Sequence, residues 1–290
     1  MLIRLRPLAY LLALALGAGA CVPPEPETFP RRFDAETYMA EIQRAGRLRI
    51  GIPEDAPPLG YVDAHTGRAK GLTVELGRAL ARFLRVEPDF RRYPSARLIG
   101  LVEVGGLDVA FPATPIDENL VRTQGVSDPY LVAHQRLLVP TASGIEEVEG
   151  LSGSRLCSLL QPGTGVDVAR LVTNVQVLSV LDLDSCLAAL RAGAADAITA
   201  EDFRLLYARR VLERTPGAPQ MSLEGANLNL VGYGAIALQS TGFPQFVRDA
   251  LNEVKSDGRW QGAYDRWIGG SAEPPTMTLE EAAALWPTDT

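Results

Sequence analysis

Residues 48–61 read LRIGIPEDAPPLGY, and this stretch decides the fold class. Its first five residues predict a short buried strand, which Pro53 and the paired prolines at 57 and 58 end. Residues 72–84 (LTVELGRALARFL) follow, and their leucines at 72, 76, 80 and 84 predict a helix with one apolar face. A helix over 96–104 and a strand over 107–111 come next. This alternation indicates an α/β protein with a parallel sheet covered by helices.

The same alternation continues toward the end of the chain. The further predicted strands cover residues 155–159, 175–180, 195–198 and 233–238. The further predicted helices cover 34–46, 166–172, 185–192, 201–212, 243–254 and 260–267, and Thr278 with Glu281 has the spacing of a capping box for one more. Two segments between the blocks, 133–140 and 228–231, are candidates for strands that cross from one block to the other.

The first 20 residues are typical of a secretory signal rather than of a folded domain. Arg4 and Arg6 precede an apolar run over 8–20 that is too short for a permanent membrane span. Cys21 follows Ala18-Gly-Ala, which resembles a bacterial lipobox, where the thiol is lipidated and becomes the mature N-terminus. Ala18 also fits an ordinary A-x-A cleavage site, so both interpretations stay open. Residues 21–33 are proline-rich and are expected to form a linker.

Composition narrows the function classes. The net charge of −7 argues against a nucleic acid as partner, and a hydrophobic content of 47% is ample for a core. The chain has neither a glycine-rich phosphate loop, nor a GxSxG motif, nor a zinc-binding histidine pair. Its two histidines, His65 and His134, fall in a predicted turn and at the start of a predicted strand. We therefore expect a binding protein without cofactor or metal, and not an enzyme.

Several short motifs occur in the order and spacing of one protein family. They lie at 48–61, 71–76, 106–110, 127–130 (SDPY), 163–165, 194–202 (AADAITAED), 233–237, 257–260 (DGRW) and 266–269. Together they resemble the amino-acid-binding solute receptors of bacterial ABC importers, which have the type II periplasmic binding fold. The resemblance implies two Rossmann-like lobes joined by two crossover strands. Lobe 1 would cover 34–136 and 231–269, lobe 2 would cover 137–230, and 270–290 would form a tail.

The cysteine count supports an oxidising compartment. Cys157 and Cys186 can pair there, which leaves Cys21 as the odd cysteine with a role at the terminus. Some members of the family carry a cysteine pair at corresponding places in the second lobe. Two free buried thiols are the alternative.

The resemblance also implies a ligand site between the lobes. The second-lobe acid that meets the ligand ammonium would be Glu201, where the family has Asp, although Glu201 could instead only initiate a helix. Gly163 and Thr164 would open a helix that seats the ligand carboxylate, or form a plain turn. In the first lobe, the residues at the cleft would be Glu54, Asp55, Ala113 and Thr114, unless they are ordinary loop residues.

Two first-lobe positions depart from the family pattern. Ala56 stands where the family has an aromatic lid over the ligand. Leu120 stands where the family has the arginine that binds the α-carboxylate, and leucine cannot replace a bidentate guanidinium. Arg122 is the nearest arginine and is our candidate for that role, unless it points to solvent.

The expected protein is thus a monomeric, lipid-anchored receptor outside the cytoplasm. It would capture a small polar solute, an amino acid by resemblance, through hinge closure and deliver it to an ABC permease. The alternative is a sensor or partner-binding lipoprotein with a degenerate ligand pocket, to which Ala56 and Leu120 point.

Overall fold

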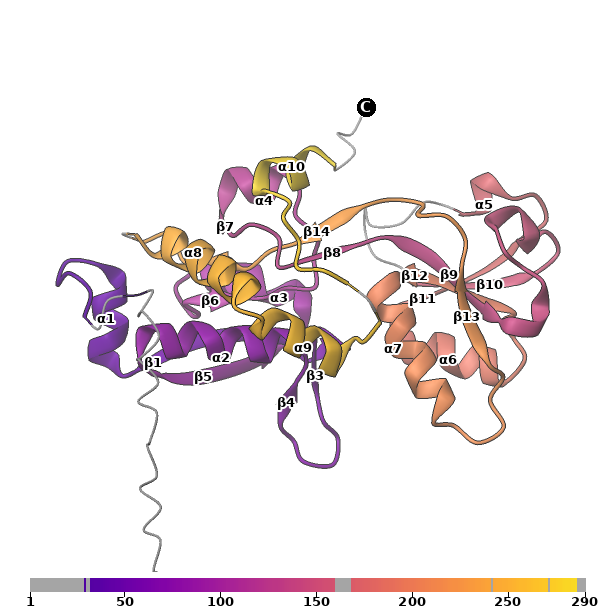
Figure 1. The fold of residues 1–290 in the computed structure, drawn as a ribbon, viewed down its shortest axis with the longest axis horizontal. Coiled ribbons are helices and arrows are strands. Elements are labelled where there is room, and N and C mark those ends of the chain that lie inside the picture. The colour runs from indigo at the N-terminus through magenta and orange to yellow at the C-terminus, as the bar shows by residue number, and fades with distance from the viewer. Residues whose placement is uncertain (1–28, 30–31, 160–167, 241, 271, 286–290) are drawn as a thin grey trace, which may run out of the picture.

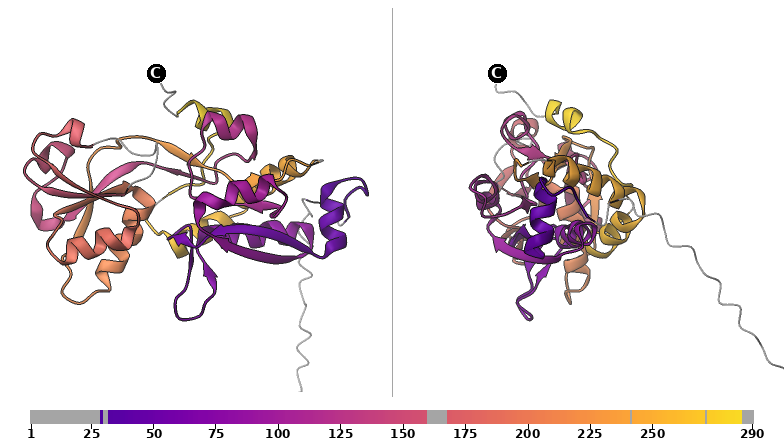
Figure 2. Two further views of the ribbon diagram at one scale, coloured as in Figure 1. Left: turned by 180° about the vertical axis from the view of Figure 1, so that it is seen from behind. Right: turned by 90° about the vertical axis from the view of Figure 1, so that its left-hand side faces the viewer.

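The computed structural model describes residues 29, 32–159, 168–240, 242–270 and 272–285. Two five-stranded sheets form two lobes that lie end to end, one on each side of a pair of connecting strands (Figure 1). Figure 2 shows the same two lobes from behind and from one end. This is the two-lobed α/β fold that the sequence predicts.

The first lobe is built on a sheet of strand order β5-β1-β6-β15-β7. Its strands are β1 (Arg47–Pro53), β5 (Glu87–Tyr93), β6 (Val109–Ala110), β7 (Gly125–Val126) and β15 (Ile236–Ala237). The strands β5, β1 and β6 are parallel, whereas β15 runs antiparallel to β6 and β7. A small sheet of β2 (Asp55–Ala56), β3 (Gly60–Val62) and β4 (Ala69–Lys70) extends from the end of β1.

Helices cover both faces of this sheet. They are α1 (Tyr38–Ala45), α2 (Leu72–Leu84), α3 (Ser95–Glu103), α4 (Glu118–Thr123), α8 (Phe243–Ser256) and α9 (Arg259–Trp267). Apolar side chains of α1, α2, α8 and α9 pack with those of the strands into the largest hydrophobic core among the described residues. The predicted apolar face of α2 is confirmed, because Leu72, Leu76, Leu80 and Leu84 are all buried.

The strand β5 was not predicted from the sequence, and its position explains why. It is the edge strand of the sheet and pairs only with β1, so most of its residues are exposed or half-buried. An edge strand tolerates charges and a proline such as Pro88, which in a central strand would remove a ladder hydrogen bond.

The second lobe is built on a sheet of strand order β11-β10-β12-β9-β13. Its strands are β9 (Gln135–Pro140), β10 (Arg155–Leu159), β11 (Gln176–Val180), β12 (Ala197–Glu201) and β13 (Met221–Glu224). Its helices are α5 (Val168–Leu171), α6 (Leu183–Arg191), α7 (Asp202–Glu213) and the short turns η1 (Thr141–Ser143) and η2 (Val148–Leu151). The expected disulfide is confirmed: Cys157 of β10 and Cys186 of α6 are bonded, and both are fully buried.

The lobes are connected by a separate two-stranded ladder of β8 (Leu131–Ala133) and β14 (Val231–Tyr233). The predicted crossover at 133–140 is therefore wrong in its bounds, since 135–140 form β9 inside the second sheet. The break falls at His134, whose carbonyl oxygen accepts a hydrogen bond from the Asp202 amide at 2.8 Å instead of joining a ladder. The second crossover likewise lies over 231–233 rather than 228–231.

The C-terminal tail packs on the first lobe and contains α10 (Leu279–Ala284). The predicted capping box is present between Thr278 and Glu281. The Leu279 amide donates to an oxygen of Asp128 at 3.1 Å, and Ala282 is buried in the core. Within the part of the chain that the structure describes, no helix has the length and hydropathy needed to cross a bilayer.

Candidate functional site

A cavity of about 310 Å³ lies between the two lobes, and both lobes contribute to its wall. Its volume is at the lower end of the range for small-molecule sites. The first lobe provides Asp55, Ala56, Pro57, Ser95, Ala96, Ala113, Thr114 and Pro115. The second lobe provides Leu159, Leu181, Asp182, Leu183 and Arg204. A ligand in this cavity would therefore contact both lobes at once.

The first-lobe wall is formed where parallel strands end. Asp55 follows β1 and Ala113 follows β6, so both lie at the carboxyl edge of the sheet, where open α/β sheets bind ligands. Ser95 at the start of α3 connects them. Its hydroxyl accepts from the Ala113 amide at 2.6 Å, and its own amide donates to Oδ1 of Asp55 at 3.3 Å. Three separate segments are thus held together as one surface.

The loop that carries Asp55 and Ala56 is also tied to α2. The amides of Leu72 and Thr73 donate to the carbonyl oxygens of Pro58 and Leu59 at 3.1 and 2.9 Å. Gly71 makes this approach possible: its φ is +127°, and a Cβ there would lie 2.3 Å from the Leu59 carbonyl oxygen. The start of α2 therefore fixes the position of the first-lobe loop.

The second-lobe wall has the same construction. Leu159 is the last residue of β10, and Asp182 is the N-cap of α6, where its Oδ1 accepts from the Ser185 amide at 2.7 Å. Arg204 lies in the first turn of α7, directly after β12 ends at Glu201. The two carboxyl edges thus face the same cavity, one from each lobe.

A buried polar cluster lies next to the cavity at the start of α7. The side chains of Glu201 and Arg204 are each only 4% exposed, and Nε of Arg204 is 2.9 Å from Oε2 of Glu201. Tyr233, at the end of β14, donates its hydroxyl to Oε1 of Glu201 at 2.9 Å. Burial, and then the charge of Glu201, hold the pKa of Tyr233 well above its usual value, so the phenol stays protonated and remains a donor.

A second tyrosine of the connecting region lies within electrostatic reach of this cluster. Tyr130 immediately precedes β8 and is fully buried, and burial raises the pKa of its phenol above the usual value although the charge of Arg204 opposes this. Its hydroxyl has no hydrogen-bond partner among the described residues. Its carbonyl oxygen accepts from Nε1 of Trp260 at 2.6 Å, which ties the connection to α9.

Only part of the predicted site comes together around the cavity. Asp55, Ala113 and Thr114 line it, whereas Glu54 is exposed beside it and donates its amide to the Tyr93 carbonyl. Glu201 is buried behind Arg204 and does not line the cavity. Gly163 and Thr164 lie outside the described residues.

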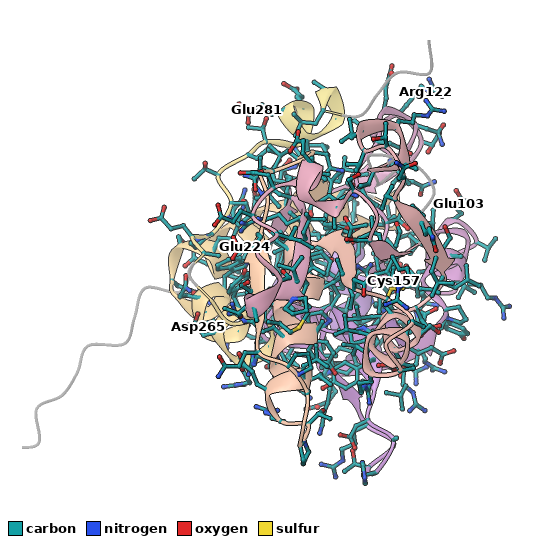
Figure 3. All side chains as sticks on the ribbon, turned by 90° about the vertical axis from the view of Figure 1, so that its right-hand side faces the viewer. Glu103, Arg122, Cys157, Glu224, Asp265 and Glu281 are labelled. Atoms are coloured by element: carbon teal, nitrogen blue, oxygen red, sulfur yellow. A yellow bond between two sulfur atoms is a disulfide. The ribbon has the colours of Figure 1, made fainter. Side chains whose placement is uncertain are left out.

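Arg122 does not reach the cavity, and the geometry of α4 explains why. The helix turns Arg122 outward, where it is exposed and donates to Oδ1 of Asn119 at 3.0 Å. Figure 3 shows it at the periphery of the molecule. Leu120 points the other way and is buried in the core of the first lobe, 6% exposed. Neither position of this helix brings a guanidinium to the cavity.

Sequence reasoning missed Arg204 and Asp182. Glu201 and Arg204 have the i, i+3 spacing of a helical ion pair, which is a signal in the sequence. However, the same spacing occurs in pairs exposed on the surface, so it does not predict a pair buried beside a cavity. Asp182, three residues before Ser185, has the spacing of a helix N-cap, but its place at the cavity depends on the tertiary fold.

A second hollow of about 260 Å³ lies between α2 and α9, but residues of the first lobe alone line it. A ligand there would contact one lobe only and could not favour closure. In the described part of the chain, no group of three or more His, Cys, Asp or Glu side chains is placed to hold a metal ion.

Residues 48–270 match the model of the bacterial extracellular solute-binding proteins, family 3. The chain belongs to this family. Among its relatives is the ABC transporter glutamine-binding protein GlnH of Bacillus subtilis (strain 168), which is 24% identical over 242 residues, 79% of this chain and 84% of the relative. The glutamate-binding protein GluB of Corynebacterium glutamicum is 24% identical over 253 residues, 84% of each chain.

The solved structures support the fold. An ancestral cationic amino acid solute-binding protein superposes with a TM-score of 0.69 at 20% identity, covering 79% of this family member and 99% of the ancestral chain. At this level of identity the likeness establishes the two-lobed fold. The identity of the ligand has to be inferred from the residues of the site instead.

Proposed function

We propose that this protein is the receptor of an ABC importer and captures an amino acid outside the cytoplasm by closing its two lobes. The observation that carries the proposal is the cavity between the lobes, because a ligand there contacts both walls. Such a ligand binds the closed arrangement better than the open one and shifts the population toward it. The closed form would then dock on the permease. The relatives named for glutamine and glutamate point to the ligand class.

The connection between the lobes supports a hinge. It consists of the three-residue strands β8 and β14, which pair with each other and with neither large sheet. We place lobe 1 at 34–134 with 231–269, lobe 2 at 135–230 and the tail from 270, because Gln135 and Arg136 begin β9 of the second sheet. We propose that the chain works as a monomer. We propose binding, not catalysis, as its role, in keeping with a family of solute-binding proteins.

The N-terminal part of the proposal is a lipid anchor at Cys21, which lies outside the described residues. Its support is the signal-like sequence before Cys21 and the proline-rich segment after it. A Cys21→Ser variant is expected to move from the membrane fraction to the soluble fraction, because a lipid chain is what holds the chain there. Equal membrane recovery of variant and wild type would contradict the anchor.

The ligand proposal is tested by thermal unfolding of the purified chain with each of the 20 L-amino acids. A ligand at about 100 times its Kd is expected to raise the Tm by roughly 5–10 °C. If only a solute other than an amino acid raises the Tm, the proposal of a solute receptor stands and the proposal of an amino acid as its ligand is rejected.

The alternative, a sensor or partner-binding lipoprotein, has two observations in its favour. Ala56 brings only a methyl group to the cavity, and Leu120 is buried in the core instead of presenting a charge to the ligand. Recovery of a protein partner, with no solute that raises the Tm, would favour this alternative over the importer receptor.

A further inference from the structure

The guanidinium of Arg204 is buried beside the cavity with unused donors. The residue is 4% exposed and yet lines the cavity wall. A guanidinium carries five N–H donors. Among the described residues, Nη2 has no hydrogen-bond partner, and Nε lies near Oε2 of Glu201 without forming a well-directed hydrogen bond. Because a buried donor without a partner is costly, this geometry points to an acceptor beyond the described residues, and a ligand in the cavity could supply one.

Glu201 cannot act as a free receptor for an ammonium group in this arrangement. Its Oε1 accepts from the Tyr233 hydroxyl, and its Oε2 faces the Arg204 guanidinium at 2.9 Å. The carboxylate is buried and does not line the cavity. Its charge therefore neutralises Arg204 and positions it, so the ligand meets the guanidinium and not the carboxylate.

The acidic residues of the cavity wall lie on its exposed side. Asp55 comes from the first lobe and Asp182 from the second, and both are exposed, whereas Arg204 is the buried charge and the one basic residue among the described lining residues. The cavity thus has positive charge at its buried side and negative charge at its exposed side. A zwitterion whose carboxylate faces inward and whose cationic group faces outward matches this distribution.

We propose that Arg204 binds the ligand carboxylate from the second lobe, and that Asp55 receives its cationic group while the charge of Asp182, whose two oxygens already accept from Ser185, adds to the attraction. Arg204 would take the role that Leu120 cannot fill in the first lobe. The orientation of the ligand would thus be opposite to that of a ligand whose ammonium group binds Glu201. This inference rests on the proposed function, since it identifies how the same site selects an amino acid.

The experiment must separate ligand binding from the neutralisation of Glu201. The double variant Glu201→Gln/Arg204→Gln removes both charges, so no buried charge is left unpaired. Calorimetric titration with the amino acid found in the thermal screen is expected to show a loss of about 100-fold in affinity. Arg204→Lys keeps a charge but not the planar fork and is expected to lose roughly 10-fold. Arg155→Gln, a second-lobe arginine outside the cavity, is the matched control.

Two further measurements test the orientation of the ligand. Glu201→Gln is expected to tighten binding, because the guanidinium is freed from its counterion; if Glu201 were the ammonium receptor, affinity would instead fall by about 100-fold. The carboxamide of the same amino acid is expected to bind the wild type about 100-fold more weakly, with no further loss in the double variant. Two results would overturn the inference. One is that the carboxamide loses as much affinity in the double variant as in the wild type. The other is that a folded double variant binds the amino acid within about threefold of the wild type.

Failure of the inference can be told apart from failure of the proposed function. If no amino acid binds the wild type, the same variants are titrated with pyruvate, lactate, succinate and 2-oxoglutarate. Binding of one of these acids that depends on Arg204 keeps the role of Arg204 toward the carboxylate, and rejects both the amino acid as ligand and the role of the two aspartates toward a cationic group. If none of these acids binds either, the inference and the proposed function are both rejected. Thermal unfolding of each variant shows whether it is folded, and Arg204→Lys serves if the double variant is not.

Discussion

Each lobe contains an Arg–Asp ion pair at the same place in its sheet, but the two lobes differ in how they are stabilised. In lobe 1, Asp108 accepts from the backbone amide of Arg49 at 2.6 Å and from its Nε at 3.0 Å. In lobe 2, Asp196 accepts from the amide of Arg155 at 2.9 Å and from its Nε at 3.0 Å. In each case the arginine lies in the first parallel strand of its sheet. The aspartate precedes the neighbouring strand, β6 or β12, so the pair joins two strands at their amino ends.

The two pairs differ in their burial. The Asp108 side chain is 3% exposed and also accepts from the Tyr38 hydroxyl at 2.7 Å, whereas the Asp196 side chain is 41% exposed. Lobe 1 has a larger core, to which α8, α9 and the tail contribute. Lobe 2 instead has the disulfide between β10 and α6. The difference indicates that the smaller lobe relies on a covalent bond where the larger one relies on burial.

Removal of the disulfide should have the largest effect on this comparison. The double variant Cys157→Ala/Cys186→Ala is expected to lower the free energy of unfolding by about 3.5 kcal/mol, because the bond closes a loop with a sequence separation of 29 residues. The measurement is urea unfolding followed by circular dichroism, with and without reductant.

Tryptophan fluorescence provides the matched control for lobe 1. All three tryptophans of the chain lie at or after residue 260, and Trp260 is buried in the first-lobe core. If the lobes unfold separately, the fluorescence transition stays in place while part of the circular dichroism transition moves to lower urea. A loss below about 1 kcal/mol would show that the bond does not carry the stability of lobe 2.

The sequence predicted those elements whose side chains are buried in a regular pattern. The bounds of α2 and β10 agree with the prediction because both are apolar where they face the core. The edge strand β5 and the short strand β13 were missed, since a strand with one neighbour needs no apolar run. Helix α1 begins at Tyr38, not at 34, because the Thr37 hydroxyl caps it by accepting from the Ala40 amide.

The candidate site was predictable to the extent that it follows strand ends. Asp55, Ala113 and Thr114 come directly after strands whose carboxyl ends meet at one edge, so their position follows from the topology. Arg122 is the arginine nearest to Leu120 in the sequence, but residues two apart on a helix face different directions. Arg204 depends on how α7 packs against the connecting strands, which no local pattern records.

The Arg–Asp pairs allow a smaller and more direct test of the same comparison. Asp108→Ala is expected to destabilise the protein by about 2–3 kcal/mol, because it leaves the Arg49 amide and the Tyr38 hydroxyl without their acceptor in a largely buried place. Asp196→Ala should cost clearly less, since water can reach both partners and replace the lost hydrogen bonds. Urea unfolding of the two variants, each with its Asp→Asn counterpart as the isosteric control, measures the difference. Equal losses would mean that the position of the pair between the strands, and not its burial, determines its contribution.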